Sequence, residues 1–502
     1  MLSEEGKKKV SMQRQELKGE GLQKASWQSD QPVVSMKQGN SCGEKGLEKV
    51  REDVGETSAE HRIGEQMSTK LVSLTLRARK DSRYKFITIM NLFTEEYLLE
   101  CFGELKKNKA PGIDGVEVEE YEADIVKNIK DLCARMKTWK YKPKPVRRVY
   151  IPKSDGTKRG LGIPAVEDKI VQVWAKKILE AIYEVDFCDV SYGFRPKRRC
   201  HEALRVLGKA IMTKPVNYVV DMDIRKFFDT INHEWMMRCL RQRITDTRFL
   251  RLIGRFLNAG VMEEGKLINT EKGTPQGGNL SPILANIYLH YVIDLWFEKK
   301  VKKQLKGYAQ LTRYADDFVA CFEKGEEAEA FSKELVERLK KFDLEIAENK
   351  SRTIKFGRRA LQEAESEKKK VETFDFLGFT HYCERARSGK FKLGRKTASK
   401  RFGQKMKAMN MWLKDIRNMV VLQEWWKILK QKLIGHYNYY GISGNVKGIA
   451  RFYWETKKLV FKWVNRRSQK RSYNWEQFEK YLHYNPLPKP KIYHSMYALS
   501  SI

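Results

Sequence analysis

Apolar residues recur at intervals of three and four along the middle of the chain. Such spacing gathers apolar side chains on one face of an α-helix, which then packs that face against the rest of a domain. The pattern predicts three long amphipathic helices. They are built on Ile125, Ile129, Leu132, Met136 and Trp139; on Val166, Ile170, Trp174, Ile178 and Ile182; and on Ala328, Phe331, Leu335, Leu339 and Phe342.

Short runs of β-forming residues lie between these helices, at positions 147–152, 217–224 and 314–322. Helices that alternate with such strands favour a layer of helices packed on an antiparallel sheet. We therefore predict an α+β domain over residues 86–385.

Strands become scarce beyond residue 385, and the apolar spacing there is helical. We predict an all-helical domain over residues 386–480, followed by a C-terminal tail at 481–502. The apolar positions of the helical domain include Trp412, Ile416, Trp426, Leu429, Leu433 and Tyr437.

Residues 1–85 are poor in aromatic side chains and rich in Gly, Ser, Gln, Lys and Glu. Such a segment buries too little apolar surface to offset the entropy lost on ordering. We predict a flexible basic N-terminal extension, in which residues 71–79 are the part expected to form a helix. An RNA-binding extension and an inert one both fit this composition.

The net charge of the chain limits the classes of partner that it is expected to bind. Lys and Arg number 98 against 64 acidic residues, a net charge of +34. A charge of this size repels itself unless the working state includes a polyanion, and phosphate contacts to nucleic acid also release counterions. The 22 Tyr, 11 Trp and 23 Phe offer rings for stacking on bases. A nucleic-acid partner is favoured over a merely soluble basic protein.

Several classes of protein do not fit the sequence. No run of about eighteen apolar residues is present, so we expect no membrane span. The N-terminus lacks the apolar core of a signal peptide. The eight cysteines stand singly, without a C-x-x-C pair, so neither a zinc ribbon nor a disulfide framework is indicated. A reducing compartment inside the cell is the expected location.

Two acidic segments suggest metal chemistry. In RYADDFVACF, Asp316 and Asp317 stand between apolar β-formers, where adjacent carboxylates are costly unless a cation neutralises them. In VVDMDIRKFFDTINH, alternation places Asp221 and Asp223 on one face of a strand, and periodicity does not choose between them. One of these acids together with the pair could hold two Mg²⁺ ions for phosphoryl transfer. Solvated acids in a turn and on an edge strand are the alternative reading.

These two segments resemble motifs A and C of reverse transcriptases, which copy RNA into DNA. The resemblance selects Asp223, Asp316 and Asp317 as catalytic residues. It places the two Mg²⁺ ions at Asp223, Ile224, Asp316 and Asp317. It also implies that Phe228, five residues after Asp223, excludes the 2′-hydroxyl of a ribonucleotide, although the adjacent Phe227 could take this role.

Further segments resemble other parts of the same family. GTPQGGNLSP at 273–282 is similar to motif B, IPKSDGTKRGLGIP at 151–164 to the finger hairpin, and AENKSRTIKFG at 347–357 to motif D. SYGFRPKRRC at 191–200 suits stacking and phosphate contact, and FDFLGF at 374–379 resembles the primer grip. The implied dNTP contacts are Lys153, Arg159, Phe228, Gln276 and Lys350. The implied template and primer contacts are Tyr192, Phe194, Arg195, Gly277, Gly278, Leu377 and Gly378. An ordinary turn, hairpin or core residue fits many of these positions as well.

Three features resemble the bacterial group II intron-encoded reverse transcriptases. They are residues 91–115 with the ending K-x-P-G-x-D-G, the SYGFRP segment, and a region from 385 to 480 similar to a thumb and maturase domain X. This implies a right-hand polymerase with fingers and palm over 86–385, and a maturase that binds its group II intron RNA to assist splicing. Its partners would be that RNA, an RNA template, a DNA primer or target, and dNTPs. The intron RNA contacts would include Lys432, His436, Tyr437, Arg466, Arg467, Lys470 and Arg471.

No paired-cysteine or H-N-H segment follows domain X, so we expect no endonuclease module and priming from nascent or nicked DNA. Two other functions stay open. One is a maturase whose polymerase site is inactive, and the other is a domesticated relative in phage defence, CRISPR spacer acquisition or DNA repair. We expect a bacterial cytoplasmic or nucleoid location, and the sequence leaves the oligomeric state open.

Overall fold

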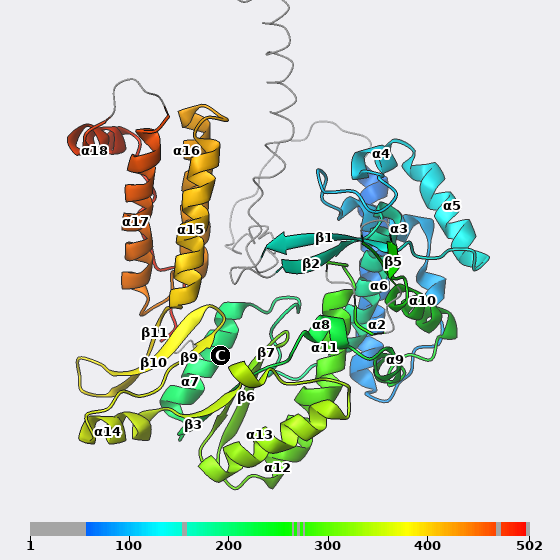
Figure 1. The fold of residues 1–502 in the computed structure, drawn as a ribbon. Helices are drawn as coiled ribbons and strands as arrows, with labels where there is room; N and C mark the ends of the chain where they lie inside the picture. The colour runs from blue at the N-terminus through cyan, green and yellow to red at the C-terminus, as the bar shows by residue number, and fades with distance from the viewer. Residues whose placement is uncertain are drawn as a thin grey trace, which may run out of the picture. The chain divides into compact units, whose positions relative to one another are not determined.

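The computed structural model describes residues 57–152, 158–263, 266–268, 272–274, 277–467 and 473–497. They form two compact units, one within residues 57–395 and one within 396–497 (Figure 1). The division lies later than the expected boundary at residue 385. Lys153, Gln276, Lys470 and Arg471 lie outside the described residues, so their predicted roles stay predictions.

The N-terminal part of the larger unit is helical. α6 (Val166–Tyr183) is its buried central helix, and Trp174 on α6 meets Phe93 and Phe249 edge-on. The Thr75 hydroxyl of α2 donates to the Ala181 carbonyl of α6 at 3.0 Å. The end of the predicted flexible extension is therefore an ordered part of this unit. The surrounding elements are α2 (Thr57–Lys80), η1 (Ile89–Leu92), α3 (Glu95–Gly103), α4 (Val118–Ala123) and α5 (Ile125–Lys137).

One four-stranded sheet follows this helical part, in the order β2-β1-β4-β5. Its strands are β1 (Val146–Pro152), β2 (Lys158–Ile163), β4 (Val261–Glu263) and β5 (Lys266–Ile268). β1 pairs antiparallel with β2 and parallel with β4. The predicted hairpin at 151–164 thus corresponds to β1 and β2.

A second four-stranded sheet has the order β6-β7-β3-β8, and all its pairs are antiparallel. Its strands are β3 (Tyr218–Asp223), β6 (Ala309–Tyr314), β7 (Asp317–Phe322) and β8 (Arg352–Lys355). α13 (Gly325–Lys340) packs against β3, β7 and β8, while α7 (Cys200–Thr213) packs against β6 (Figure 1). The register sets Asp223 opposite Asp317 at one end of the central pair, which positions the candidate site.

The remaining elements of this unit connect and flank the sheets. A third sheet has the order β11-β10-β9. The elements are α8 (Phe227–Thr230), α9 (His233–Leu240), α10 (Thr247–Leu257), α11 (Ser281–Leu289), the π-helical η2 (His290–Asp294) and η3 (Phe297–Val301), α12 (Lys302–Gln304), η4 (Glu348–Lys350), α14 (Arg358–Ser366), β9 (Phe374–Phe376), β10 (Phe379–Arg385) and β11 (Phe391–Thr397).

The second unit is helical in its described residues. It contains α15 (Ser399–Ile416), α16 (Leu422–Tyr440), α17 (Val446–Val464) and α18 (Trp475–Tyr484). Its core is aromatic, with Trp412 edge-on to Trp425 and Trp425 beside Trp426. The Tyr437 hydroxyl donates to the Pro488 carbonyl at 3.1 Å, so part of the predicted C-terminal tail packs on this unit.

The expected fold class is confirmed at the level of a mixed α/β region with antiparallel sheets followed by a helical region. Among the described helices, none combines the length and apolarity needed to cross a membrane. The seven cysteines within the described residues are all free thiols.

Candidate active site

The turn between β6 and β7 carries two adjacent acids. Ala315 has a φ of 58°, a left-handed conformation that costs energy for a residue with a Cβ atom. The Arg313 side chain donates from Nη1 to the Ala315 carbonyl at 2.8 Å and so holds this turn. Asp316 follows in the turn, and Asp317 begins β7 opposite Asp223 at the end of β3.

These carboxylates lie close enough to disturb one another's ionisation. Burial, and after it the charges of Asp221, Asp316 and Asp223, together raise the pKa of Asp317 to about 8. The pKa of Asp316 is also raised, first by burial and then by Asp223, while Arg159 acts in the opposite direction. Like charges gathered in a partly buried setting favour binding of a cation, because the cation offsets their repulsion.

The residues present fit a divalent cation at this place. Carboxylate oxygens of Asp223, Asp316 and Asp317 are the hard ligands that such ions prefer. Ile224 has a buried apolar side chain, so only its carbonyl oxygen could be a ligand. No three acidic, histidine or cysteine side chains of the described ranges are gathered into a ready-made coordination cluster. One oxygen of Asp223 instead accepts a hydrogen bond from Lys350 Nζ at 2.6 Å.

The structure distinguishes Asp221 from Asp223, which the alternation along the strand does not. Asp221 lies 4.0 Å from Arg352 and is opposite Val319 in the β3–β7 pairing. Burial raises the pKa of Asp221 to about 7, with Arg352 opposing and Asp375 adding to the rise. Asp223 is the residue opposite Asp317, and it faces Lys350. Asp223 is therefore the better ligand candidate, with Asp221 as a neighbour.

The raised pKa of Asp317 predicts a stability cost in the absence of metal. A carboxyl with a higher pKa in the folded chain than its ordinary value near 4 binds its proton more tightly when folded. Its contribution to stability is complete below about pH 4 and is lost as the pH rises to about 8. At pH 8 without Mg²⁺, Asp317→Asn should raise the melting temperature by a few degrees.

Calorimetry with and without Mg²⁺ checks this expectation. The exposed residue Asp131 on α5 provides a control, because Asp131→Asn should leave the melting temperature nearly unchanged. Mg²⁺ should stabilise the wild type and have little effect on Asp317→Asn. A lower melting temperature for Asp317→Asn at pH 8 would contradict the repulsion argument.

The two neighbouring phenylalanines differ in their surroundings. Phe227 is 2% exposed, belongs to the core and lies 6.5 Å from the Tyr288 ring, measured between ring centroids. Phe228 is only half-buried and packs edge-on against Phe227 at 5.3 Å. The Phe228 carbonyl accepts from the Thr274 amide at 2.7 Å. Of the two rings, only Phe228 therefore keeps exposed surface, and its contact with a nucleotide sugar stays a prediction.

The predicted nucleotide loop lies beside these elements in its described part. Gly277 has a φ of 114°, and an added Cβ would lie 2.6 Å from the Gly162 carbonyl oxygen of β2. An added Cβ on Gly278 would lie 2.9 Å from Oε1 of Gln172, which accepts from the Asn279 amide. Close packing against β2 and α6 is thus sufficient reason for both glycines, and their template contacts stay predictions.

The SYGFRP segment packs under the acidic turn, and two of its predicted nucleic-acid contacts need correction. The guanidinium of Arg195 is buried, donating to Glu184 and to the carbonyls of Cys188 and Ser191. Tyr192 is buried as well, and its amide donates to the Arg313 carbonyl. Neither side chain has surface left for a template. Phe194, half-buried with a φ of 56°, keeps its prediction.

The predicted primer-grip turn lies next to the acids. A backbone hydrogen bond from Leu377 lowers the pKa of Asp317, which places the turn between β9 and β10 against the start of β7. The Leu377 side chain is buried, so a primer contact by that side chain is corrected to a packing role. Gly378 is half-buried in the same turn, with a φ of 77°, and its primer contact stays a prediction.

The predicted RNA contacts of the helical unit divide into core and surface. His436 is buried and stacks on Phe452 at 3.6 Å between ring centroids, and Tyr437 is buried too. Both side chains serve packing, which corrects their expected RNA contact. Lys432 lies over the Trp412 ring, and burial lowers its pKa to about 8. Arg466 is exposed, and the Arg467 Nε donates to the Arg417 carbonyl.

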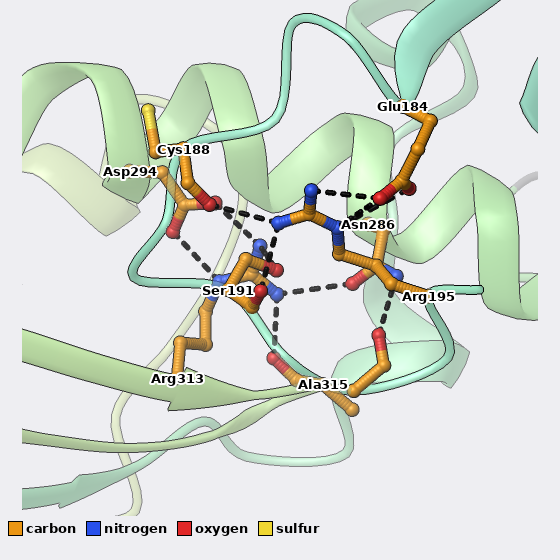
Figure 2. A network of polar contacts seen from close by, with 9 residues as sticks. Glu184, Cys188, Ser191, Arg195, Asn286, Asp294, Arg313 and Ala315 are labelled. Carbon is orange, nitrogen blue, oxygen red and sulfur yellow. Dashed lines mark hydrogen bonds and ion pairs between the residues drawn. The ribbon is translucent and has the colours of Figure 1, made fainter. Parts of the chain in front are cut away.

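Reasoning from the sequence missed a buried polar network behind the acidic turn. Arg313 on β6 pairs with Asp294 at the end of η2, and both side chains are 0% exposed (Figure 2). Ser191 and Asn286 complete the network. A charged residue inside each of two otherwise apolar runs, LTRYA and YVIDLWF, is the signal that could have found it.

Similarity to known proteins shows the family to which this chain belongs. A family model described as reverse transcriptase (RNA-dependent DNA polymerase) matches residues 151–381, which include Asp221, Asp223, Asp316 and Asp317. Protein YkfC of Escherichia coli (strain K12) is 34% identical over 274 residues, covering 48% of this chain and 72% of YkfC. The chain belongs to the reverse transcriptase family.

Other relatives of this reverse transcriptase are intron-encoded. The group II intron-encoded protein LtrA of Lactococcus lactis subsp. cremoris is 39% identical over 203 residues, covering 40% of this chain and 34% of LtrA. An uncharacterized 91 kDa protein in the cob intron of Schizosaccharomyces pombe is 36% identical over 216 residues, covering 43% of this chain and 26% of that protein. The matches thus span about a third or less of these two relatives.

These comparisons confirm the predicted reverse transcriptase family, whose activity is RNA-directed DNA polymerisation, and show similarity to two intron-encoded proteins. Reverse transcriptases are nucleotidyltransferases that generally use divalent metal ions. The assignment agrees with the position of Asp223, Asp316 and Asp317 at one end of the β3–β7 pair, where their charges affect one another's ionisation.

Proposed function

We propose that this chain is a right-hand polymerase that extends a DNA primer on an RNA template with dNTPs and two Mg²⁺ ions, and that it also binds group II intron RNA as a maturase. The observation that carries the polymerase is the apposition of Asp223 with Asp317, beside Asp316, at one end of the central strand pair. In this proposal fingers and palm lie within the larger unit, and the helical unit is thumb and domain X.

Asp223, Asp316 and Asp317 would hold the metal ions, with the Ile224 carbonyl as a further ligand. When bound, two such ions would stabilise the negative charge on the attacking and leaving oxygens of an in-line displacement. The chain itself fixes the positions of these carboxylates. The β3–β7 register fixes where Asp223 and Asp317 stand, and the Leu377 backbone bonds to Asp317. Phe228 would lie under the sugar, where a ring leaves no room for a 2′-hydroxyl.

Arg159 is a candidate ligand of the triphosphate. It lies near enough to Asp316 for its charge to oppose the rise of that residue's pKa. A guanidinium near the proposed metal-binding acids can bind phosphate oxygens through paired hydrogen bonds. Lys153 and Gln276 belong to the same proposed dNTP contacts.

Lys350 is proposed to act on the leaving pyrophosphate. Its ammonium bonds to Asp223 at 2.6 Å, and its side chain is 70% exposed. An exposed ion pair contributes little to stability, so its position is better explained by the reaction. If Asp223 held a cation, the Lys350 ammonium would be free to donate a proton to the leaving oxygen.

Replacing this ammonium gives a testable rate loss. Lys350→Ala should slow single-turnover nucleotide addition by about 10²-fold, the usual contribution of a general acid. It should leave the melting temperature nearly unchanged. Lys355→Ala provides a matched control, since Lys355 is an exposed lysine on β8 paired with Glu363. A wild-type rate for Lys350→Ala would remove Lys350 from the chemistry.

The identity of the product tests the polymerase proposal. Purified protein should extend a DNA primer annealed to RNA only when dNTPs are present, and the product should be degraded by DNase and resist RNase. NTPs should support little extension. A product made of RNA, or extension that needs no template, would contradict the proposed reaction.

The maturase proposal rests on the LtrA similarity and on exposed basic residues of the helical unit such as Arg466. It is tested with an intron RNA whose domains enclose this reading frame. The protein should promote splicing of that RNA at Mg²⁺ concentrations at which the RNA alone does not splice. Splicing unaffected by the protein would remove the maturase role and favour a domesticated polymerase. The bacterial cytoplasmic location stays a prediction.

A further inference from the structure

A buried ion pair lies directly behind the acidic turn. Arg313 Nε donates to Asp294 Oδ1 at 2.7 Å, Arg313 Nη2 bonds to Asp294 Oδ2, and neither side chain is exposed. Removing two charges from water is costly, and such a pair often adds no net stability. Stability therefore does not explain why this ion pair is present.

Every N–H group of the Arg313 guanidinium has an acceptor. Besides Asp294, Nη1 donates to the Asn286 side chain at 3.1 Å and to the Ala315 carbonyl at 2.8 Å, and Nη2 donates to Ser191 Oγ at 2.8 Å (Figure 2). A guanidinium has five N–H donors in a fixed plane, so a fully bonded one fixes the relative positions of all its acceptors.

The acceptor nearest the chemistry is the Ala315 carbonyl. Ala315 is left-handed, with a φ of 58°, and its peptide leads into Asp316. A residue with a Cβ keeps this strained conformation only where its surroundings hold it. Arg313 supplies that restraint from the buried side of the turn.

The SYGFRP segment also contacts the β6–β7 turn that carries Ala315. The Gly193 carbonyl accepts from Asn286 Nδ2 at 2.7 Å, which ties this segment to α11. A Cβ added to Gly193 would lie 2.3 Å from the Ala315 nitrogen, so the two backbones touch. The Arg313 amide and carbonyl also bond to Val190 and Tyr192.

We infer that Arg313 and Asp294 are positioning residues for DNA synthesis, because the pair holds the Ala315 peptide and through it sets Asp316 for metal binding. This inference rests on the proposed metal-binding role of Asp316. The same network joins α11, which follows the proposed nucleotide loop, to the metal-binding turn.

The test replaces the pair without leaving a lone buried charge. Arg313→Met with Asp294→Leu removes the bond to Ala315, and apolar replacement of a buried pair usually preserves folding. The double variant should melt cooperatively and bind RNA like the wild type. Its rate at saturating dNTP should fall by about tenfold or more, the usual cost of losing groups that orient metal ligands. The dNTP concentration giving half the maximal rate should change little.

A measurement without substrate separates positioning from general damage. Mg²⁺ should raise the melting temperature of the wild type, and this rise should be reached only at about tenfold higher Mg²⁺ in the double variant. A matched control is Asp186→Asn, which disturbs another buried arginine, Arg243, whose Nε lies 3.0 Å from Asp186. That control should lose stability while keeping the wild-type Mg²⁺ dependence.

Gly193→Ala provides a second variant in which the ion pair stays intact. Its methyl group would press on the Ala315 nitrogen and should give the same loss of rate and weaker Mg²⁺ response. Gly193→Ala tests the inference even if the double variant does not fold. Wild-type rate and Mg²⁺ dependence in a folded double variant or in Gly193→Ala would overturn the inference, as would an equal Mg²⁺ shift in the control. Absence of extension by the wild type would instead refute the proposed function.

Discussion

Asp316→Ala should lower DNA synthesis by about 10³-fold or more and leave RNA affinity intact. Asp316 lies in the β6–β7 turn beside Asp317 and Asp223, where its carboxylate would hold the cations that stabilise the transition state. Removing one charge-stabilising group from an active site already costs about 10²–10³ in rate. RNA binding depends on cationic and aromatic surface, which this substitution does not touch.

Primer extension and filter binding on the same preparation measure the two activities. Asp131→Ala, on the exposed face of α5, is the control and should behave as the wild type in both assays. Equal loss of synthesis and RNA affinity in Asp316→Ala would mean that the turn supports the fold of the RNA-binding surface and does not act mainly on the chemistry.

Phe228→Ala should admit ribonucleotides. Phe228 lies in α8, five residues after Asp223; its ring is half-buried and its carbonyl accepts from the Thr274 amide. Removal of the ring creates space for a 2′-hydroxyl, so the preference for dNTP over NTP should fall by about 10²-fold, the scale on which a pocket rejects an added hydroxyl. Competition between dATP and ATP in single-nucleotide extension measures this preference.

Phe227 provides the contrasting variant. Because Phe227 is buried in the core, Phe227→Ala should cost about 3–5 kcal/mol of stability and leave sugar selection unchanged. Phe228→Tyr, which keeps a ring in place, should retain selection against NTPs. Unchanged discrimination in Phe228→Ala, or relaxed discrimination in Phe227→Ala, would show that the gate has been assigned to the wrong ring.

Much of this arrangement could be predicted from short-range patterns. Helical spacing predicted α6 and α13, which the structure gives as Val166–Tyr183 and Gly325–Lys340. The DD pair between apolar β-formers predicted the hairpin turn that carries Asp316. These features depend on residues close together in sequence, so periodicity and turn chemistry suffice to find them.

What could not be predicted depends on contacts between distant residues. Arg195 and His436 look like RNA-binding residues because their neighbours in sequence are basic or aromatic, yet Glu184 and Phe452 enclose them in the folded chain. Periodicity could not choose between Asp221 and Asp223, since both share one face of the strand; the family resemblance selected Asp223, and the β3–β7 register sets Asp223 opposite Asp317. Asp294 and Arg313 are 0% exposed, and only folding brings them together.

The most direct test of the central claim is primer extension on an RNA template with dNTPs and Mg²⁺, comparing the wild type with Asp316→Ala. The wild type should extend the primer and Asp316→Ala should not, although Asp316→Ala should still bind RNA. Extension by both proteins would contradict the assignment of the metal-binding carboxylates. Extension by neither, with salt-sensitive RNA binding retained in both, would contradict the polymerase itself and leave a maturase that does not copy RNA.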